Sequence, residues 1–158
     1  MLFNEKDIHI DSNYLIKYKK NNILIPLEIE SPLLYLPFGI DKLYNNYYLK
    51  LQLRPFTESH LKSFLKTIES LESSLRIITK KKIKSQIIMS DLYDPIINTK
   101  VLSLKNKIQT LVTKDNEHFN FYSIKKGIYL KVYISVDRLW KLNEAEFTYK
   151  LKLKKIML

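Results

Sequence analysis

The length, composition and charge of this chain exclude several classes of protein before any motif is considered. The chain has 158 residues, of which 46% are hydrophobic and 12% aromatic, as is typical of one folded domain around a single core. It contains no cysteine, which excludes disulfides, thiolate metal sites and cysteine nucleophiles. Its two glycines are too few for a glycine-rich phosphate-binding loop.

The net charge of +11 is the strongest signal in the composition. A field of this sign favours nucleic acid or an anionic membrane surface as a partner. However, nearly all the basic residues are lysines, and isoleucine, asparagine and tyrosine are also abundant. Because an AT-rich genome produces the same composition, the charge leaves two explanations open: ligand binding and codon bias.

No targeting segment is expected in this chain. Residues 1–14, MLFNEKDIHIDSNY, contain acidic residues where a signal peptide requires basic residues followed by an apolar run. The apolar runs are also far shorter than the roughly 20 residues that span a bilayer. We therefore expect a soluble intracellular protein without membrane contact. We expect residues 1–158 to form one domain, with residues 1–22 as a candidate peripheral extension.

The first half of the chain predicts two strands separated by turns. Residues 23–30, ILIPLEIE, alternate in part and predict a strand that Pro26 bends or places at an edge. Pro37-Phe38-Gly39 then predicts a turn. Residues 47–54 alternate without a break and predict a strand whose outward side chains are Tyr48, Lys50, Gln52 and Arg54.

One amphipathic helix is predicted between Pro55 and Arg76, with Thr57 as its N-cap. The apolar stripe consists of Leu61, Phe64, Leu65, Ile68, Leu71 and Leu75, and the polar face of Lys62, Lys66, Glu69, Glu72 and Ser73.

The rest of the chain predicts β-structure. The expected strands cover residues 84–89, 99–112 (two strands with a turn near 105–107), 119–124, 127–136 and 146–156. The fold class is therefore mainly β (α+β): an OB-like small antiparallel barrel with one long amphipathic helix inserted between strands.

Enzyme signatures are absent from the sequence, so we expect no catalysis, no cofactor and no metal. His9, His60 and His118 lie far apart without the spacing of metal ligands. Asp91 and Asp94 resemble a carboxylate pair, but Asp94-Pro95 is a common turn opener, which favours a capping role.

Basic and aromatic side chains recur on the outward faces of three predicted strands. The strand at 127–136 presents Tyr129, Lys131 and Tyr133, and the strand at 146–156 presents Lys150, Lys152 and Lys154. Together with Tyr48, Lys50 and Arg54, these residues are typical of single-strand binding, in which bases stack on aromatic rings and lysines follow the backbone. The alternative is an ordinary solvated face, because half-exposed strands alternate and lysine is the common polar residue here. We interpret Lys80, Lys81, Lys82 and Lys84 as a solvated loop and place Trp140 in the core.

Several segments in this order resemble the phage-type OB-fold single-stranded DNA-binding proteins of nucleocytoplasmic large DNA viruses. These segments are SPLLYLPFGI (31–40), YYLKLQL (47–53), the helix, TKVLSLKNK (99–107), RLW (138–140) and FTYKLKLKKIML (147–158). The shared features are the Pro37-Phe38-Gly39 turn, a strand bearing Lys100 and Lys105, and Leu139-Trp140 near the end.

The resemblance implies a non-enzymatic protein that coats single-stranded DNA during viral replication or recombination, in a cytoplasmic viral factory or the nucleus of a host. It adds Lys100 and Lys105 to the candidate DNA-binding residues and implies a turn role for Gly39 and packing roles for Phe38 and Trp140. Two alternative functions remain open: a structural or adaptor protein such as a virion component, and an RNA-binding or transcription-associated OB protein. Homo-oligomerisation and the identity of protein partners are open as well.

Overall fold

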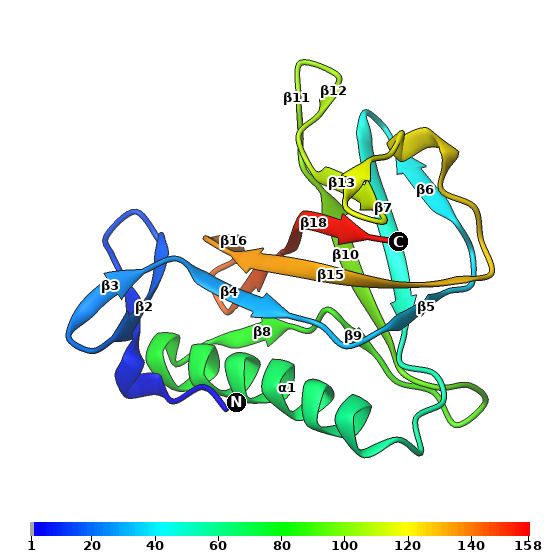
Figure 1. The fold of residues 1–158 in the computed structure, drawn as a ribbon. Coiled ribbons are helices and arrows are strands. Elements are labelled where there is room, and N and C mark those ends of the chain that lie inside the picture. The colour runs from blue at the N-terminus through cyan, green and yellow to red at the C-terminus, as the bar shows by residue number, and fades with distance from the viewer. Residues whose placement is uncertain (1) are drawn as a thin grey trace.

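Five strands close into a barrel in the computed structural model, which describes residues 2–158. In chain order they are β5 (Leu34–Leu36), β7 (Asn46–Gln52), β10 (Ile96–Val101), β15 (Ile128–Val136) and β18 (Leu151–Met157). Antiparallel pairs join β5 to β7, β7 to β10, β15 to β18 and β15 to β5, while β10 and β18 run parallel. This closed ring confirms the OB-fold expected from the sequence (Figure 1).

The barrel interior is filled by the apolar side chains that alternation predicted. Leu49, Leu51 and Leu53 have no exposed surface, and the same holds for Leu130, Val132, Ile134 and Val136 of β15. A fully buried leucine contributes about 1.5–3 kcal/mol relative to an exposed one, so the barrel strands supply much of the core.

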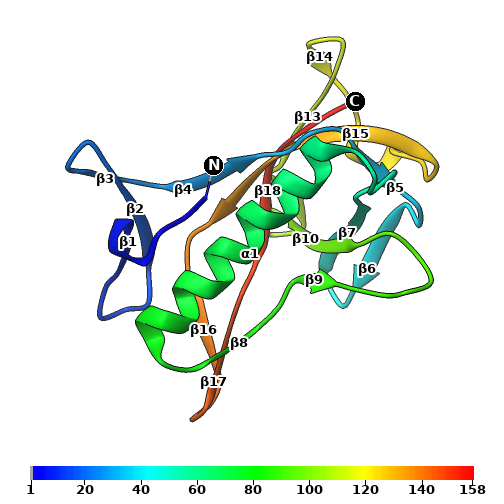
Figure 2. The same cartoon turned by 90° about the horizontal axis from the view of Figure 1, so that it is seen from below.

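The long helix α1 (Ser59–Thr79) covers one end of the barrel, the lower end in Figure 1, and Figure 2 shows it from below. Its predicted apolar stripe is buried in the same core cluster as the barrel strands. The helix begins after Glu58, whose side chain makes no capping hydrogen bond, so the prediction of Thr57 as N-cap was wrong. Glu72, predicted on the polar face, is only 4% exposed.

Shorter strands extend the barrel sheet on several sides. Strand β4 (Leu27–Glu30) continues along β15 beyond β5. The single strand predicted at 23–30 is divided at Pro26 into β3 (Ile23–Ile25) and β4, which belong to different sheets. Strand β6 (Ile40–Leu43) forms a hairpin with β7. Strand β9 (Ile87–Ile88) pairs with β10, and β13 (Leu111–Lys114) joins β18 and β14 (Glu117–His118).

Two small sheets and one hairpin complete the fold. Strands β16 (Leu139–Asn143), β17 (Glu146–Tyr149) and β8 (Lys82–Lys84) form one sheet, with β17 in the middle. Strands β1 (Ile8–Ile10), β2 (Ile16–Lys20) and β3 form the other. Strands β11 (Ser103–Leu104) and β12 (Lys107–Ile108) form a hairpin whose two turn residues, Lys105 and Asn106, both have positive φ, as a two-residue type I′ turn requires.

The N-terminal residues pack against the body of the protein. The short 3-10 helix η1 (Glu5–Asp7) lies near α1, and the backbone N–H of Phe3 donates a hydrogen bond to Ser70 Oγ at 2.8 Å. Phe3, Ile8 and Ile16 belong to the main core cluster. Across residues 2–158 no helix qualifies as a membrane span.

Further strand predictions were wrong in detail: where two strands were expected at 99–112, the structure has parts of β10, β11, β12 and β13. Residues 119–124 contain the 3-10 helix η2 (Phe121–Ser123), because the Asn120 side chain accepts a hydrogen bond from the Tyr122 N–H and caps a turn. The predicted strand at 146–156 is two strands, β17 and β18, that belong to different sheets and meet at Lys150. The predicted strand at 84–89 is likewise divided between β8 and β9.

Candidate nucleic-acid interface

The outer surface of the barrel carries lysine in matching positions on three adjacent strands. Lys100 on β10 lies directly opposite Tyr48 on β7 and Lys152 on β18, so these three residues form one row across the sheet. One step along, Asn98 on β10 is the partner of Lys50 on β7. Side chains of cross-strand partners project from the same face of a sheet. The aromatic and basic residues of the β7–β10–β18 face therefore gather on one surface.

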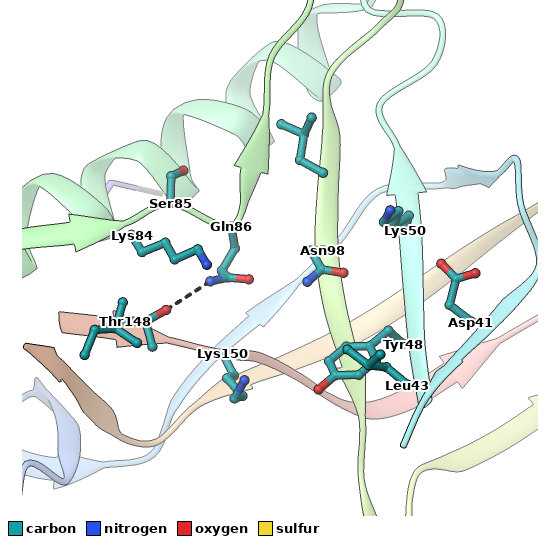
Figure 3. A pocket seen from close by; sticks show the side chains of 12 residues that line it. Asp41, Leu43, Tyr48, Lys50, Lys84, Ser85, Gln86, Asn98, Thr148 and Lys150 are labelled. Atoms are coloured by element: carbon teal, nitrogen blue, oxygen red, sulfur yellow. Dashed lines mark hydrogen bonds between the residues drawn. The ribbon is translucent and has the colours of Figure 1, made fainter. Parts of the chain in front are cut away.

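This surface is hollowed into a pocket of ≈ 580 Å³, which we call the barrel groove. Figure 3 shows Lys84, Gln86 and Thr148 on one side, Asp41, Leu43, Tyr48 and Lys50 on the other, and Asn98 and Lys150 between them. The lining also includes Ser85, Ile88 and Leu142. A smaller hollow lined by Tyr48, Gln86, Asn98 and Lys150 extends the groove to Lys100.

Four parts of the fold supply the walls of the groove. Strands β7 and β10 form the floor, and the β6–β7 hairpin, which connects the first barrel strand to the second, contributes Asp41 and Leu43. The β16–β17 hairpin, which connects the fourth barrel strand to the fifth, contributes Leu142 and Thr148. Segment 84–88 closes the side nearest α1. The groove is thus assembled from residues 41 to 150.

The groove is electrostatically positive. Its lining contains three lysines and one aspartate. The pKa of Lys100 lies below the ordinary value of 10.5, mainly because the side chain is partly desolvated and further because Lys150 and Lys152 repel its charge. Asp137 relieves part of this repulsion and forms an ion pair of 3.0 Å with Lys152. A polyanion bound beside these lysines would supply negative charge and would reduce the repulsion between them.

A buried hydrogen-bond network holds the groove wall against α1. The Glu72 carboxylate accepts hydrogen bonds from Tyr149 Oη, from Ser85 Oγ at 2.8 Å and from the backbone N–H of Gln86 at 3.0 Å. The Gln86 amide then donates to Thr148 Oγ1 at 3.3 Å. The carboxylate therefore has a structural role: it pins residues 85 and 86 in the position from which they line the groove.

Other predicted binding residues lie outside the groove. Tyr129, Lys131 and Tyr133 project from β15, on another side of the barrel, where Tyr129 packs against Tyr35 with ring centroids 5.1 Å apart. Arg54, just beyond β7, covers the Tyr35 ring at 4.8 Å.

Three other predicted binding residues, Lys131, Lys154 and Lys105, also lie outside the groove lining. Lys131 forms a salt bridge with Glu30, which lowers the pKa of Glu30 and raises that of Lys131, so its charge is already balanced. Lys154 lies at the irregularity where the β15–β18 register shifts, and Lys105 lies at the tip of the β11–β12 hairpin.

The structure also identifies groove residues that the sequence analysis missed. Asn98 could have been found, because it alternates with Lys100 on one face of the strand Ile96–Val101. Lys84 was assigned to a solvated loop, but it lines the groove.

Two packing expectations were wrong. Trp140 is 39% exposed and the Arg138 guanidinium lies 4.5 Å from its ring centre, so it is not a core residue. Phe38 is 59% exposed and does not pack inside.

A second hollow of ≈ 590 Å³ lies beside the β11–β12 hairpin. Its lining contains one lysine, Lys107, and a cluster of aromatic rings that includes Phe121 and Tyr122. Its low charge makes it the weaker candidate for a polyanion. Among residues 2–158 no group of three or more histidine, aspartate or glutamate side chains could hold a metal ion.

The fold matches solved structures of two phage proteins. The structure of gp2.5, a single-stranded DNA-binding protein encoded by bacteriophage T7, matches with a TM-score of 0.57 and 15% identity over 83% of this chain and 90% of that one. The single-stranded DNA-binding protein from bacteriophage Enc34 matches with a TM-score of 0.59 and 15% identity over 95% and 87% of the two chains. A C-terminally truncated form of the Enc34 protein matches with a TM-score of 0.58 and 14% identity, over 96% of this chain and 92% of that one.

At these identities the matches establish a shared fold alone. No protein-family model matches the sequence, and no curated protein matches it.

Proposed function

We propose that this protein binds single-stranded DNA along the barrel groove, without sequence preference. The observation that carries the proposal is the place of the groove in the fold. In OB-folds, oligonucleotides lie across the second and third strands, between the loop joining strands 1 and 2 and the loop joining strands 4 and 5. Here those elements are β7, β10, the β6–β7 hairpin and the β16–β17 hairpin, and all four line the groove.

The chemistry of the groove fits a single strand. Lysines at positions 50, 84, 100 and 150 supply charge along the floor and one wall, where a sugar-phosphate backbone needs it. Tyr48 supplies an aromatic surface beside them, and base stacking on such a ring contributes about 1–3 kcal/mol. Contacts of this kind do not read base edges, so we expect the binding to tolerate any sequence.

The phage proteins with this fold are single-stranded DNA-binding proteins by their names, which supports the same ligand here. The shared fold and the resemblance to viral proteins together support a non-enzymatic role in coating DNA strands during replication or recombination of a viral genome.

Fluorescence anisotropy with labelled oligonucleotides of equal length tests the proposal. We expect single-stranded DNA to bind more tightly than duplex DNA, with log affinity falling by about 0.7 per neutralised phosphate for each tenfold rise in salt. The same titration with single-stranded RNA distinguishes an RNA-binding protein. Equal weak binding to all three ligands would contradict the proposal and would indicate that the charge of +11 is compositional.

A matched pair of charge reversals locates the site. Lys50→Glu places a negative charge in the groove, whereas Lys17→Glu makes the same change on the exposed face of β2, in the N-terminal sheet. We expect the first variant to lose most of its affinity and the second to change it little. Equal losses in both variants would mean that the net charge alone attracts DNA.

A further inference from the structure

We infer that Trp140 and Arg138 form a stacking subsite for one unpaired nucleobase at the edge of the barrel groove. The inference rests on the proposed function and extends it to two residues that do not line the groove and were not candidate binding residues in the sequence analysis. Its basis is the position of Trp140 in the sheet formed by β16, β17 and β8, the exposure of its ring and the contact with Arg138.

The two faces of this small sheet have different environments. One face carries Leu139, Phe147, Tyr149 and Ile83, which are all buried in the core. The other face carries a row of cross-strand partners: Trp140 on β16 pairs with Thr148 on β17, and Thr148 pairs with Lys84 on β8. Because cross-strand partners project from the same face, the indole of Trp140 lies on the side of the sheet that faces away from the core.

That outer face is continuous with the groove. Lys84 and Thr148, the other two members of the row, both line the groove, and so does Leu142, two residues after Trp140. The Trp140 ring is therefore the next side chain in a row that already forms the groove wall. A strand lying against Lys84 and Thr148 reaches Trp140 without leaving the surface of this sheet.

The Arg138 guanidinium makes the exposed ring suitable for a base. Its central carbon lies 4.5 Å from the centre of the Trp140 ring, which is within the range of a cation–π contact. The contact holds the indole in place, so little conformational entropy is lost when a base stacks on its remaining exposed surface. It also places a permanent positive charge next to that base, where its phosphate would lie.

Trp140 is the only tryptophan in the sequence, so the emission of the protein under selective tryptophan excitation reports on this subsite directly. We expect a single-stranded homopolymer of thymidine to quench this emission, with a midpoint equal to the one measured by anisotropy on the same samples. An abasic strand of equal length offers phosphates without bases. We expect it to bind more weakly and to leave the emission nearly unchanged.

Substitutions provide the second readout. Loss of one stacked base corresponds to an affinity about 5- to 150-fold lower, which we expect for Trp140→Ala, whereas Trp140→Phe recovers part of the loss because it keeps a ring. Neither variant should change the salt dependence, because neither removes a cation. Circular dichroism of each variant checks that the barrel is folded, and the wild-type quenching experiment requires no variant.

The outcomes separate this inference from the proposed function. Binding by anisotropy without any change in tryptophan emission, or equal quenching by the abasic strand, would overturn the stacking subsite and leave the groove intact. Absence of binding to single-stranded DNA in the anisotropy experiment would overturn both.

Discussion

Lys100 and Lys152 lie directly opposite each other on the parallel strands β10 and β18, on the outer surface of the barrel. Two like charges on neighbouring strands repel each other. The lowered pKa of Lys100 reflects first its desolvation and then the charges of Lys150 and Lys152. Repulsion between Lys100 and Lys152 lowers the stability of the free protein, and a bound polyanion would reduce this repulsion. We therefore expect the DNA ligand proposed above to stabilise the barrel when it binds.

Lys100→Met tests for this repulsion because methionine keeps much of the apolar stem and removes the charge. A lowered lysine pKa means that the folded protein binds this proton less tightly than the unfolded chain does, so the charge lowers stability at neutral pH. We expect the free energy of unfolding to rise by up to about 0.5 kcal/mol, a small gain because solvent screens a partly exposed charge. Urea denaturation measures it.

The same variant should bind single-stranded DNA less tightly, with a salt slope smaller by about 0.7 because the protein neutralises one phosphate fewer. Anisotropy titrations at several salt concentrations measure this slope. A less stable variant with an unchanged slope would show that Lys100 is a structural residue.

The β15 side of the barrel should contribute little to DNA binding, although its tyrosines and lysine resemble a binding face in the sequence. Lys131 is paired with Glu30, so a phosphate would have to displace an existing partner. We expect Lys131→Met to change the affinity for single-stranded DNA by less than about twofold, because an exposed ion pair contributes little free energy. Lys50→Met is the matched comparison in the groove, and an equal loss in both variants would place DNA on β15 as well.

Tyr149 anchors α1 to strand β17 of the small sheet through its hydrogen bond to the buried Glu72 carboxylate. Tyr149→Phe removes the donor and leaves the carboxylate with Ser85 and Gln86. Hydrogen bonds to charged groups contribute about 1.5–3 kcal/mol, so we expect a loss of this size in the free energy of unfolding by urea. Ser90→Ala is a suitable control, because that hydroxyl accepts from a loop N–H. If Tyr149→Phe lowers the free energy of unfolding by less than Ser90→Ala does, the hydrogen bond to Glu72 does not anchor the helix.

The same tyrosine predicts a pH dependence. The pKa of Tyr149 is raised well above 10.0, first by burial of the phenol and second by the negative charge of Glu72. The unfolded chain therefore releases this proton at lower pH than the folded protein. The protonated phenol of Tyr149 therefore makes its full contribution to the free energy of unfolding below pH 10.0. This contribution declines as the pH rises above 10.0, by up to about 1.36 kcal/mol per pH unit.

Urea denaturation of wild type and Tyr149→Phe at pH values on both sides of 10.0 isolates this contribution, because the other tyrosines and lysines titrate in both proteins. We expect the wild type to lose more stability than the variant. Parallel losses in the two proteins would show that Tyr149 ionises like an exposed tyrosine.

Gly39 ends the Pro37-Phe38-Gly39 turn with φ +73°. A Cβ there would meet Lys126 Cβ at 3.6 Å, which is an ordinary contact, so the cost of a side chain is conformational. We expect Gly39→Ala to lower the free energy of unfolding by about 1–2 kcal/mol, measured by thermal or urea denaturation. Gly39→Asn should cost less, because asparagine tolerates the left-handed region, and equal losses would point to a steric cause.

How much was predictable depends on the range of the interactions involved. Alternation along 47–54 and 127–136 predicted which side chains of β7 and β15 fill the barrel, because burial on one face of a strand follows a period of two. The apolar spacing after Pro55 predicted α1 for the same kind of reason. These are properties of single elements and need no knowledge of their neighbours.

The basic face that carries the groove depends on pairing between elements that are far apart in the chain. Lysines 50, 100 and 152 come from three strands, and only the parallel β10–β18 pair and the antiparallel β7–β10 pair place them on one surface. Sequence alone grouped Tyr48 and Lys50 with Tyr129 and Lys131, because outward residues of different strands look alike.

The same limit explains Trp140, which was expected in the core. An indole after an apolar strand usually packs inside, but the register of Trp140 with Thr148 places it on the outer face of its sheet. Hydrophobic periodicity is local, so the order of residues along β7, β15 and α1 was enough to identify their buried apolar side chains, although the polar Gln52 and Glu72 are buried as well. Register and strand order arise from contacts between distant segments, so the outward residues that share a surface became known only from the folded chain.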